Sequence, residues 1–273
     1  MKIAIIGCGY VGMAVARYFY PQPGSVVTAT TTTPERVTIL ENIAHQVTVV
    51  KGSDTLGLKS VVQNQDVILL CVGARGKSYQ DTYIHTAQNL VSLVRQTPSV
   101  KQLIYTSSYG IYGDQQGRLV EESTPLAPAT ANQQILADTE QILLSATSAQ
   151  RRVCIFRLGG IYGPSRELVK IYGRVAGKTI PGNGFEPSNW IHLDDIVGAI
   201  AFASQQQLQG VYNLVDDSQL QRRELIEQVL SKHNLNPITW DKSQPSSRPY
   251  NIRVSNQKIK QAGYQLIHPY III

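Results

Sequence analysis

The stretch at residues 2–12, KIAIIGCGYVG, carries the clearest structural signal in this sequence. Its apolar run, residues 3–6, is short, unbroken and rich in β-branched side chains, which is typical of a strand buried on both faces. Gly7, Gly9 and Gly12 follow in a G-x-G-x-x-G spacing, and helix-compatible residues continue to Tyr20. Such glycines allow a tight turn, close approach of a diphosphate and close helix packing. The stretch therefore predicts a dinucleotide site, and a merely glycine-rich turn is the alternative.

Strand-like and helix-like segments alternate through the first 160 residues. The predicted strands after the first are Ser25–Thr30, Val47–Val50, Val67–Val72, Gln102–Ser107 and Val153–Leu158, and the predicted helices are Pro34–Ile43, Asp81–Gln96 and Ala131–Ser145. Apolar strands alternating with helices predict an α/β fold with a Rossmann-type, doubly wound parallel sheet. Ligands of such sheets bind beyond the carboxyl ends of the strands, which places residues 7–12, 31–33, 73–75 and 107–110 along one rim.

After residue 160 the alternation loosens, and Pro164–Pro187 is rich in glycine and proline, as in a loop-dominated lobe. Further along we expect a strand at Val211–Val215 and helices at Asp194–Ser204, Arg222–Lys232 and Asn256–Ala262. The predicted organisation is therefore a dinucleotide-binding core at residues 1–160 and a small substrate-side lobe at residues 161–273. Within the lobe, residues 190–216 are expected to return to the core.

The composition limits the classes of function. The formal net charge of +6 comes from scattered basic residues, so we expect no nucleic acid partner. No apolar run approaches the roughly 18–20 residues that span a bilayer, and no signal peptide precedes the first strand, so we expect a cytoplasmic protein without a membrane partner. Cys8, Cys71 and Cys154 fit reduced, buried thiols. The five histidines show no paired spacing, which predicts no metal site.

Residues 106–113, TSSYGIYG, resemble a motif of the extended short-chain dehydrogenases/reductases, the NAD-dependent epimerase/dehydratase family. Three further stretches fit this family in order: RLGGIYGP at 157–164, WIHLDDIV at 190–197 and VYNLVDD at 211–217. The resemblance covers nearly the whole chain and implies a nicotinamide cofactor lying across the sheet. The G-x-G-x-x-G spacing differs from the G-x-x-G-x-x-G of many extended members, which points to an atypical, sugar-nucleotide-epimerase-like branch. A homodimer is an expectation from the resemblance alone.

The catalytic pair of this family is missing. Its members use a Tyr-x-x-x-Lys pair, in which lysine lowers the pKa of the phenol, beside a serine that orients the substrate oxygen. Ser108 matches that serine, but counting from Glu140 or Pro128 puts Asn132 at the tyrosine position and Leu136 at the lysine position. Tyr109 is the candidate substitute proton donor, and without a cationic neighbour its pKa should stay high. The alternative is that Tyr109 only packs or forms hydrogen bonds.

The end of the second strand, TTTPER at residues 31–36, indicates the cofactor. Hydroxyls followed by Arg36 suit a 2′-phosphate, so we expect NADP(H) over NAD(H), although Glu35 could still reach the ribose. The alternative for the threonine run is simple β-propensity. The predicted cofactor-binding residues are Gly7, Gly9, Tyr10, Val11, Gly12, Thr31, Thr32, Arg36, Val72, Gly73 and Ser107.

Two arginines are candidates for the substrate side. Arg248, in SRPYN at 247–251, resembles the arginine that contacts a substrate diphosphate in the family, and Arg166 could join it. Gly160 stands where the family pattern carries an asparagine near the substrate, which weakens the case for an ordinary nucleotide sugar. The sequence therefore predicts an NAD(P)-binding oxidoreductase or epimerase with altered acid/base groups and a small sugar-like or phosphorylated substrate. The alternative is a non-catalytic NAD(P)-binding redox sensor or scaffold.

Overall fold

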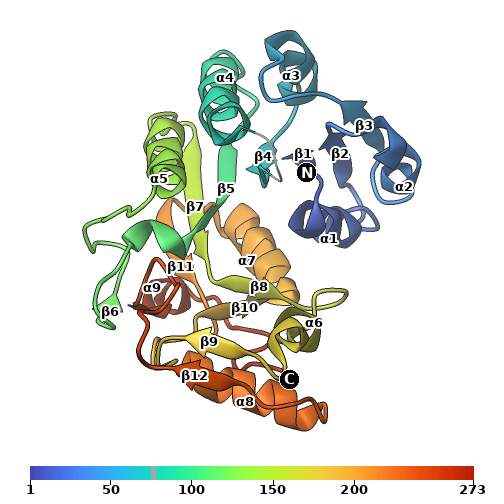
Figure 1. Cartoon of the computed structure of the whole chain (residues 1–273). Coiled ribbons are helices and arrows are strands. Elements are labelled where there is room, and N and C mark those ends of the chain that lie inside the picture. Colours follow the sequence, from blue (N-terminus) through green and yellow to red (C-terminus); the bar gives the residue numbers. More distant parts are fainter. Residues whose placement is uncertain (75–77) are drawn as a thin grey trace. The chain divides into compact units, whose positions relative to one another are not determined.

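The computed structural model describes residues 1–74 and 78–273, and its largest feature is a seven-stranded sheet (Figure 1). The strands lie in the order β11 (Gly210–Leu214), β7 (Arg152–Leu158), β5 (Gln102–Ser108), β4 (Val67–Leu70), β1 (Lys2–Ile6), β2 (Val26–Thr31) and β3 (Gln46–Val49). β1 pairs in parallel with both β2 and β4, so the strand order reverses beside β1. This order confirms the predicted doubly wound parallel sheet. Arg75, the last residue of the predicted rim segment 73–75, lies outside the described residues.

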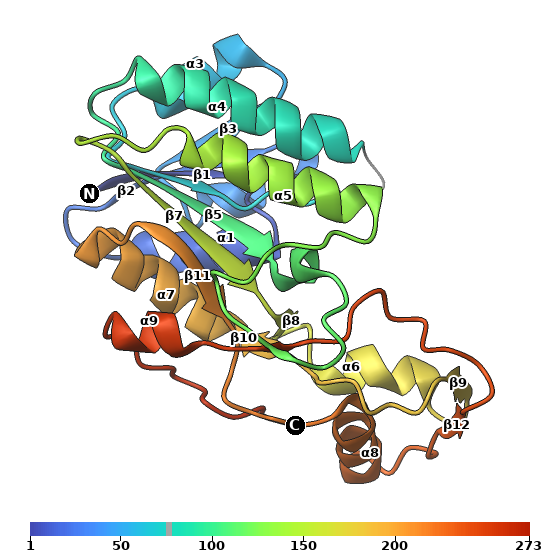
Figure 2. The same cartoon turned by 90° about the vertical axis from the view of Figure 1, so that its left-hand side faces the viewer.

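Helices cover both faces of this sheet (Figure 2). One face carries α3 (Thr55–Val62), α4 (Thr86–Arg95) and α5 (Ala131–Leu144), and the other carries α1 (Tyr10–Phe19) and α7 (Leu193–Gln206). α2 (Val37–Glu41) packs beside β3. The central strands β1 and β4 are apolar because both faces are covered: all four residues of β4 are buried, and Ile3 and Ile5 of β1 are fully buried.

Several helices differ from the sequence prediction in length or existence. Pro34 begins a short 3-10 helix, Pro34–Arg36, before α2, where its missing N–H leaves no bond unmade. The predicted helix at 81–96 is a π-helical turn, Gln80–His85, followed by α4. The sequence analysis missed α3, although Asp54 caps it by accepting a hydrogen bond from the Gly57 N–H at 2.9 Å.

The chain divides into two compact units. Unit 1 comprises Met1–Ser108, Ala131–Arg157 and Val197–Tyr212, and unit 2 comprises Tyr109–Thr130, Leu158–Ile196 and Asn213–Ile273. Unit 2 contains the parallel pairs β8 (Gly160–Tyr162) with β10 (Trp190–His192), β9 (Thr179–Pro181) with β12 (Thr239–Asp241), and β6 (Leu119–Val120) with β13 (Arg253–Val254). Its short helices are α6 (Leu168–Tyr172), α8 (Arg222–Lys232) and α9 (Gln257–Gln261). The predicted loop at 164–187 therefore holds α6 and β9, and the predicted domain division at residue 160 stays a prediction.

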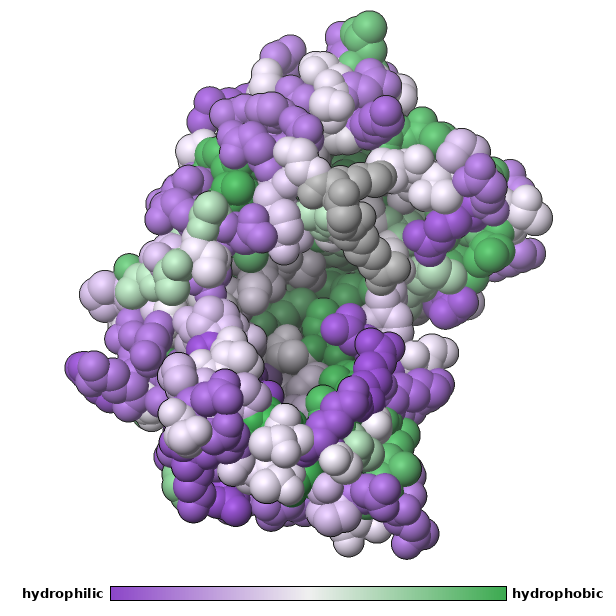
Figure 3. Space-filling model, viewed as in Figure 1, coloured by the Kyte–Doolittle hydropathy of each residue, from purple (hydrophilic) through white to green (hydrophobic). Residues whose placement is uncertain are grey.

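The surface is mostly hydrophilic on the face shown in Figure 3. Apolar atoms show there over α2 and α3, and the exposed large apolar side chains include Ile39, Val49 and Leu56. Single apolar side chains of this kind are normal on a globular protein. Within the described residues, no helix combines the length and the apolar character needed to cross a bilayer.

A buried ion pair joins α5 to β7. Arg157 donates from Nη2 to Glu140 Oε2 at 2.7 Å and from Nε to both carboxylate oxygens at 3.2 Å. The Glu140 side chain is 0% exposed and that of Arg157 is 5% exposed. A bidentate ion pair of this kind can be buried because each charged group is hydrogen-bonded to the other. Removal of one partner leaves the other as an unpaired buried charge.

We expect Arg157→Met to lower the free energy of unfolding by about 3–5 kcal/mol, because Glu140 would keep a buried charge without its partner. The double variant Arg157→Met/Glu140→Leu should recover most of that loss. Urea unfolding followed by circular dichroism measures both. Arg152→Met, at the exposed start of the same strand, is the matched control and should change stability little. Equal losses in the single and double variants would contradict this account.

Candidate functional site

The turn after β1 is shaped by glycines that cannot carry a side chain. Gly7 has φ +92°, and a Cβ there would lie 2.9 Å from Val72 Cα, at the end of β4. A Cβ on Gly12 would lie 2.7 Å from the Gly7 carbonyl oxygen. Both positions therefore require glycine, because the turn packs directly against its own helix and against the neighbouring strand end.

The beginning of α1 is open. Gly9 is the N-cap, no side chain caps the helix there, and its first turn has no acidic residue. A Cβ on Gly9 would meet no atom of the described residues within 4 Å, and the same holds for Gly73 after β4. Tyr10 and Val11 are the first residues of α1. Backbone N–H groups at a helix start, with no side chain in front of them, form an anion site.

Arg36 lies next to this turn. Its Nη2 is 2.9 Å from Met13 Sδ of α1. Burial raises the pKa of the Cys8 thiol to about 12, against the opposing positive charges of Arg36 and Arg17. Those two charges therefore lie close to the glycine turn.

The end of β2 supplies hydroxyls beside this region. Thr31 is buried, and its Oγ1 accepts a hydrogen bond from the Thr33 N–H at 3.1 Å. Thr32 and Glu35 are exposed. The structure thus places Thr31, Thr32 and Arg36 at the strand end that the sequence analysis named, with Arg36 as the residue that reaches toward α1.

Asn132 and Leu136, which replace the family's Tyr-x-x-x-Lys pair, lie on α5 in unit 1. Asn132 is exposed in the first turn of α5, and Leu136 is half-buried and packs on the apolar cluster between the helices and the sheet. Ser107 is buried and Ser108 half-buried at the end of β5. Leucine has no ionisable group, so position 136 supplies no charge to lower the pKa of a phenol.

Tyr109 has a cationic neighbour after all. Arg248 Nη2 donates to the Tyr109 hydroxyl at 3.4 Å, and the Tyr109 ring contacts Tyr250 edge-on with centroids 5.1 Å apart. The expectation of a phenol without a cation nearby was therefore wrong. Tyr109 is nonetheless 4% exposed, and this burial raises its pKa above the usual range although Arg248 opposes the shift. The phenol therefore keeps its proton at neutral pH.

A second arginine in unit 2 lies near Arg248. Burial lowers the pKa of Arg222, and the charge of Arg248 lowers it further. Arg222 Nη1 is buried and donates no hydrogen bond to any described residue, and both carboxylate oxygens of nearby Glu186 are likewise buried and unbonded among those residues. The Glu186 carboxylate offsets one of the two positive charges, and the unused Arg222 donor can still serve an anionic oxygen beside the two guanidinium groups.

The sequence analysis missed Arg222. A signal was present, because Arg222 and Arg223 begin α8, where a helix dipole disfavours positive charge. Arg166 is exposed, in a turn closed by its own N–H to the Gly163 carbonyl at 2.9 Å. Arg222, which was not among the predicted site residues, therefore lies close enough to Arg248 for their charges to interact.

Residues 3–214 match the sequence model of the NAD dependent epimerase/dehydratase family. The chain belongs to this family. Protein YeeZ of Escherichia coli strain K12 is 31% identical over 260 residues, which cover 90% of this chain and 89% of that protein. The predicted family resemblance is confirmed, and it extends over nearly the whole chain.

Solved structures of similar fold include two with bound NAD. A dTDP-glucose 4,6-dehydratase from Bacillus anthracis, in complex with NAD, superposes with a TM-score of 0.81 at 21% identity, covering 98% of this chain and 92% of that one. A UDP-glucose 4-epimerase from Thermus thermophilus, in complex with NAD, gives 0.79 at 19% identity, covering 98% and 94%. At this identity the likeness supports the fold.

The family motifs meet in pairs within unit 2. The Tyr112 hydroxyl of the TSSYGIYG motif donates to Asn213 Oδ1 of the VYNLVDD motif at 2.8 Å. A Cβ on Gly160 would lie 2.8 Å from the ring of Trp190, which begins the WIHLDDIV motif. The indole therefore takes the space that a side chain would need at position 160. The family's asparagine is absent there for a steric reason.

Asp216 of the VYNLVDD motif is a buried carboxyl. Its Oδ1 accepts a hydrogen bond from the Ser218 N–H at 2.9 Å, whereas its Oδ2 is buried without a partner among the described residues. Burial raises its pKa to about 8, and the charges of Asp217 and Asp195 add to the shift. Asp216 therefore holds a proton at neutral pH in the folded chain.

The raised pKa of Asp216 makes the free energy of unfolding depend on pH. Between pH 4 and 8 the folded state binds a proton at Asp216 that the unfolded state releases. The contribution of Asp216 to the free energy of unfolding therefore falls as pH rises, by at most about 1.4 kcal/mol per pH unit. We expect Asp216→Asn to flatten the fall, measured by urea unfolding at several pH values. Asp138→Asn, on the exposed side of α5, is the control and should keep the slope of the unaltered chain. An unchanged slope in Asp216→Asn would contradict the assignment.

Proposed function

We propose that this chain binds a nicotinamide dinucleotide and acts as an oxidoreductase or epimerase on a small sugar-like or phosphorylated substrate. The glycine turn carries this proposal. Its close packing at Gly7 and Gly12 excludes side chains, while Gly9 leaves the start of α1 open. That combination fits a diphosphate, which needs backbone donors and close approach. Membership of the NAD dependent epimerase/dehydratase family supports the same cofactor class.

We infer a preference for NADP(H) over NAD(H) from the end of β2. The strand ends in threonines, so no carboxylate stands at the strand end to accept hydrogen bonds from a ribose. Arg36 is held against α1 by its contact with Met13, and Arg17 adds positive charge nearby. A guanidinium in this place suits a 2′-phosphate, whereas Glu35, one residue earlier, is exposed.

Fluorescence titration with NADPH and NADH tests the cofactor site. Arg36→Ala should weaken NADPH binding roughly tenfold or more and leave NADH binding nearly unchanged, because one charge-assisted contact to phosphate is lost. Gly9→Ala should weaken the binding of both with little loss of stability, since its added Cβ meets no described atom within 4 Å and lies where the diphosphate would approach. Arg152→Ala is the charge-matched control. A clear preference of the unaltered chain for NADH would refute the NADP(H) proposal, and binding of neither would refute the dinucleotide site.

The residues proposed to bind the substrate lie in unit 2. Arg248 donates to the Tyr109 hydroxyl, and Arg222 has a buried donor with no described acceptor. The two guanidinium groups can hold a phosphate oxygen and place the attached substrate against the Tyr109 phenol. The cofactor, when bound, supplies the transfer of a hydride. Tyr109 would then hold the proton for the substrate oxygen, because burial keeps its phenol neutral.

We expect Tyr109→Phe to abolish turnover and leave cofactor affinity unchanged, because the substitution removes the proton-bearing oxygen and keeps the ring. Turnover is followed by cofactor absorbance in a screen of phosphorylated and nucleotide-linked sugars. Tyr18→Phe, an exposed tyrosine of α1, is the control. Unchanged turnover in Tyr109→Phe would assign this residue to packing alone.

The second candidate is a non-catalytic NAD(P)-binding sensor or scaffold. It is favoured by the exposed Asn132 and the core-packed Leu136, which leave no base of the usual kind on α5. The same absorbance screen separates the two candidates. Cofactor binding without turnover of any substrate would favour the sensor. A cytoplasmic location and a homodimer remain proposals drawn from the sequence.

A further inference from the structure

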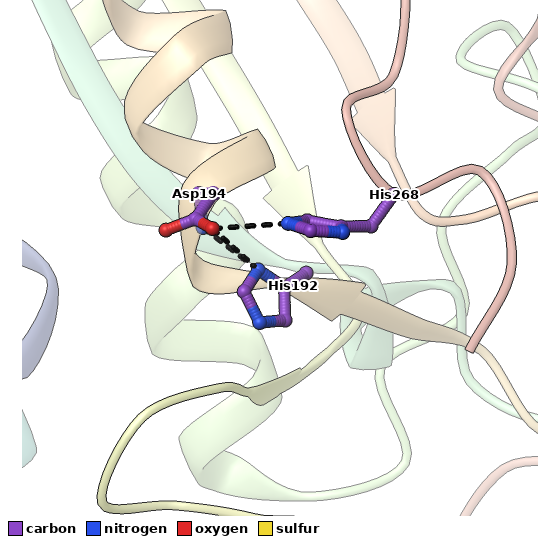
Figure 4. A group of neighbouring side chains, drawn as sticks. All are labelled: His192, Asp194 and His268. Atoms are coloured by element: carbon purple, nitrogen blue, oxygen red, sulfur yellow. Dashed lines mark hydrogen bonds and ion pairs between the residues drawn. The ribbon is translucent and has the colours of Figure 1, made fainter. Parts of the chain in front are cut away.

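Two histidines and an aspartate meet in unit 2, and one of the histidines is distant from the other two residues in sequence (Figure 4). His192 ends β10, Asp194 lies in the first turn of α7, and His268 comes from the C-terminal segment. One ligand atom of each side chain lies within 4.8 Å of the other two. Asp194 Oδ2 is 2.9 Å from His268 Nε2 and 3.3 Å from His192 Nδ1.

We propose that His192, Asp194 and His268 form a binding site for a divalent transition metal, with Zn²⁺ as the ion that fits best. Imidazole nitrogens and a carboxylate oxygen are ligands that Zn²⁺ prefers. At bond lengths of about 2.0–2.2 Å, tetrahedral coordination separates neighbouring ligand atoms by about 3.4 Å. The two nitrogen-to-oxygen distances, 3.3 and 2.9 Å, are close to that separation.

The hydrogen-bonding pattern also favours a cation. The Asp194 N–H donates to His192 Nδ1 at 3.2 Å, so this nitrogen carries a lone pair rather than a proton, and a bound metal ion would take that lone pair over from the hydrogen bond. His192 Nδ1 and Asp194 Oδ2 are then two electron-rich atoms 3.3 Å apart. A metal ion shared between them would replace this unfavourable contact with two bonds, and His268 would supply the third.

The three side chains are held in place by the fold around them. The buried Asp195 carboxylate accepts hydrogen bonds from the Ile267 N–H at 2.6 Å and the His268 N–H at 3.0 Å, which fixes the backbone that carries the His268 imidazole. His192 packs edge-on against Tyr162, with ring centroids 5.0 Å apart. Such support beside ligands lowers the cost of assembling a site.

The site is also accessible. The Asp194 side chain is 53% exposed, while those of His192 and His268 are 10% and 23% exposed. An ion can therefore enter from the Asp194 side and keep a water molecule as its fourth ligand. Bound there, it would tie the C-terminal segment to the start of α7. Linear spacing hid this site, because residues 192 and 268 come together only in the fold.

Calorimetric titration with ZnCl₂ tests the proposal, on tag-free chain dialysed against a chelator and then freed of it. We expect one saturable site per chain, a rise in Tm with Zn²⁺ concentration, and no comparable binding of Mg²⁺, which prefers oxygen ligands. His268→Ala and Asp194→Asn should each weaken Zn²⁺ binding at least tenfold. Substitution with Co²⁺ should give the intense visible absorption of tetrahedral coordination, and His268→Ala should lose it.

The matched control is His233→Ala, an exposed histidine at the end of α8. It should bind Zn²⁺ as the unaltered chain does. His268→Gln serves if His268→Ala does not fold, which unfolding in the absence of metal reveals. The proposal is overturned if Zn²⁺ binding is not saturable, if the His268 variants bind Zn²⁺ with unchanged affinity, or if His233→Ala loses it. Cofactor binding is measured separately, and its outcome does not decide this site.

Discussion

The glycine turn that follows β1 packs directly against the residues that follow β4, and this close approach decides which side chains this edge of the sheet can carry. The Gly7 Cα faces Val72 so closely that a single methyl group would overlap Val72 Cα, and Gly12 lies equally close to the Gly7 carbonyl. Because the strand order reverses here, the turn and the β4 end converge at one edge. The same closeness that forbids side chains leaves the N–H groups at the start of α1 as the surface that a ligand meets.

Residues of the family motifs make several of the buried polar contacts that hold each unit together. Glu140, the acidic end of the catalytic pattern, forms the buried fork with Arg157 of the next motif. Asp195 anchors the backbone of the C-terminal segment, and Tyr112 donates to Asn213. Each of these contacts joins segments distant in sequence, and losing one partner would leave a buried polar group unsatisfied. The architecture can therefore survive replacement of the Tyr-x-x-x-Lys pair by Asn132 and Leu136.

The sheet was predictable from sequence because its strands are short apolar runs with both faces covered, and the glycine spacing fixed where the first of them ends. α3 was missed although Asp54 is a usable N-cap, because Gly57 interrupts its apolar pattern. β9 was hidden for a different reason. Its residues around Ile180 pair with a strand near Trp240, and no local pattern encodes a partner so far along the chain.

The residues of the candidate site could likewise be predicted only in part. Local patterns revealed the glycine turn and Arg36, because a turn and the following helix are built from neighbouring residues. They did not reveal that Arg248 contacts Tyr109 or that His268 contacts Asp194, because these residues are far apart in sequence. They also could not show that the Trp190 ring covers Gly160. That ring leaves no room for an asparagine side chain at position 160, so the proposed substrate site relies on the charged groups of Arg222 and Arg248 instead of a neutral amide. Under the proposed function, a charged group such as phosphate, rather than a pattern of sugar hydroxyls, would be the feature of a substrate that these arginines bind.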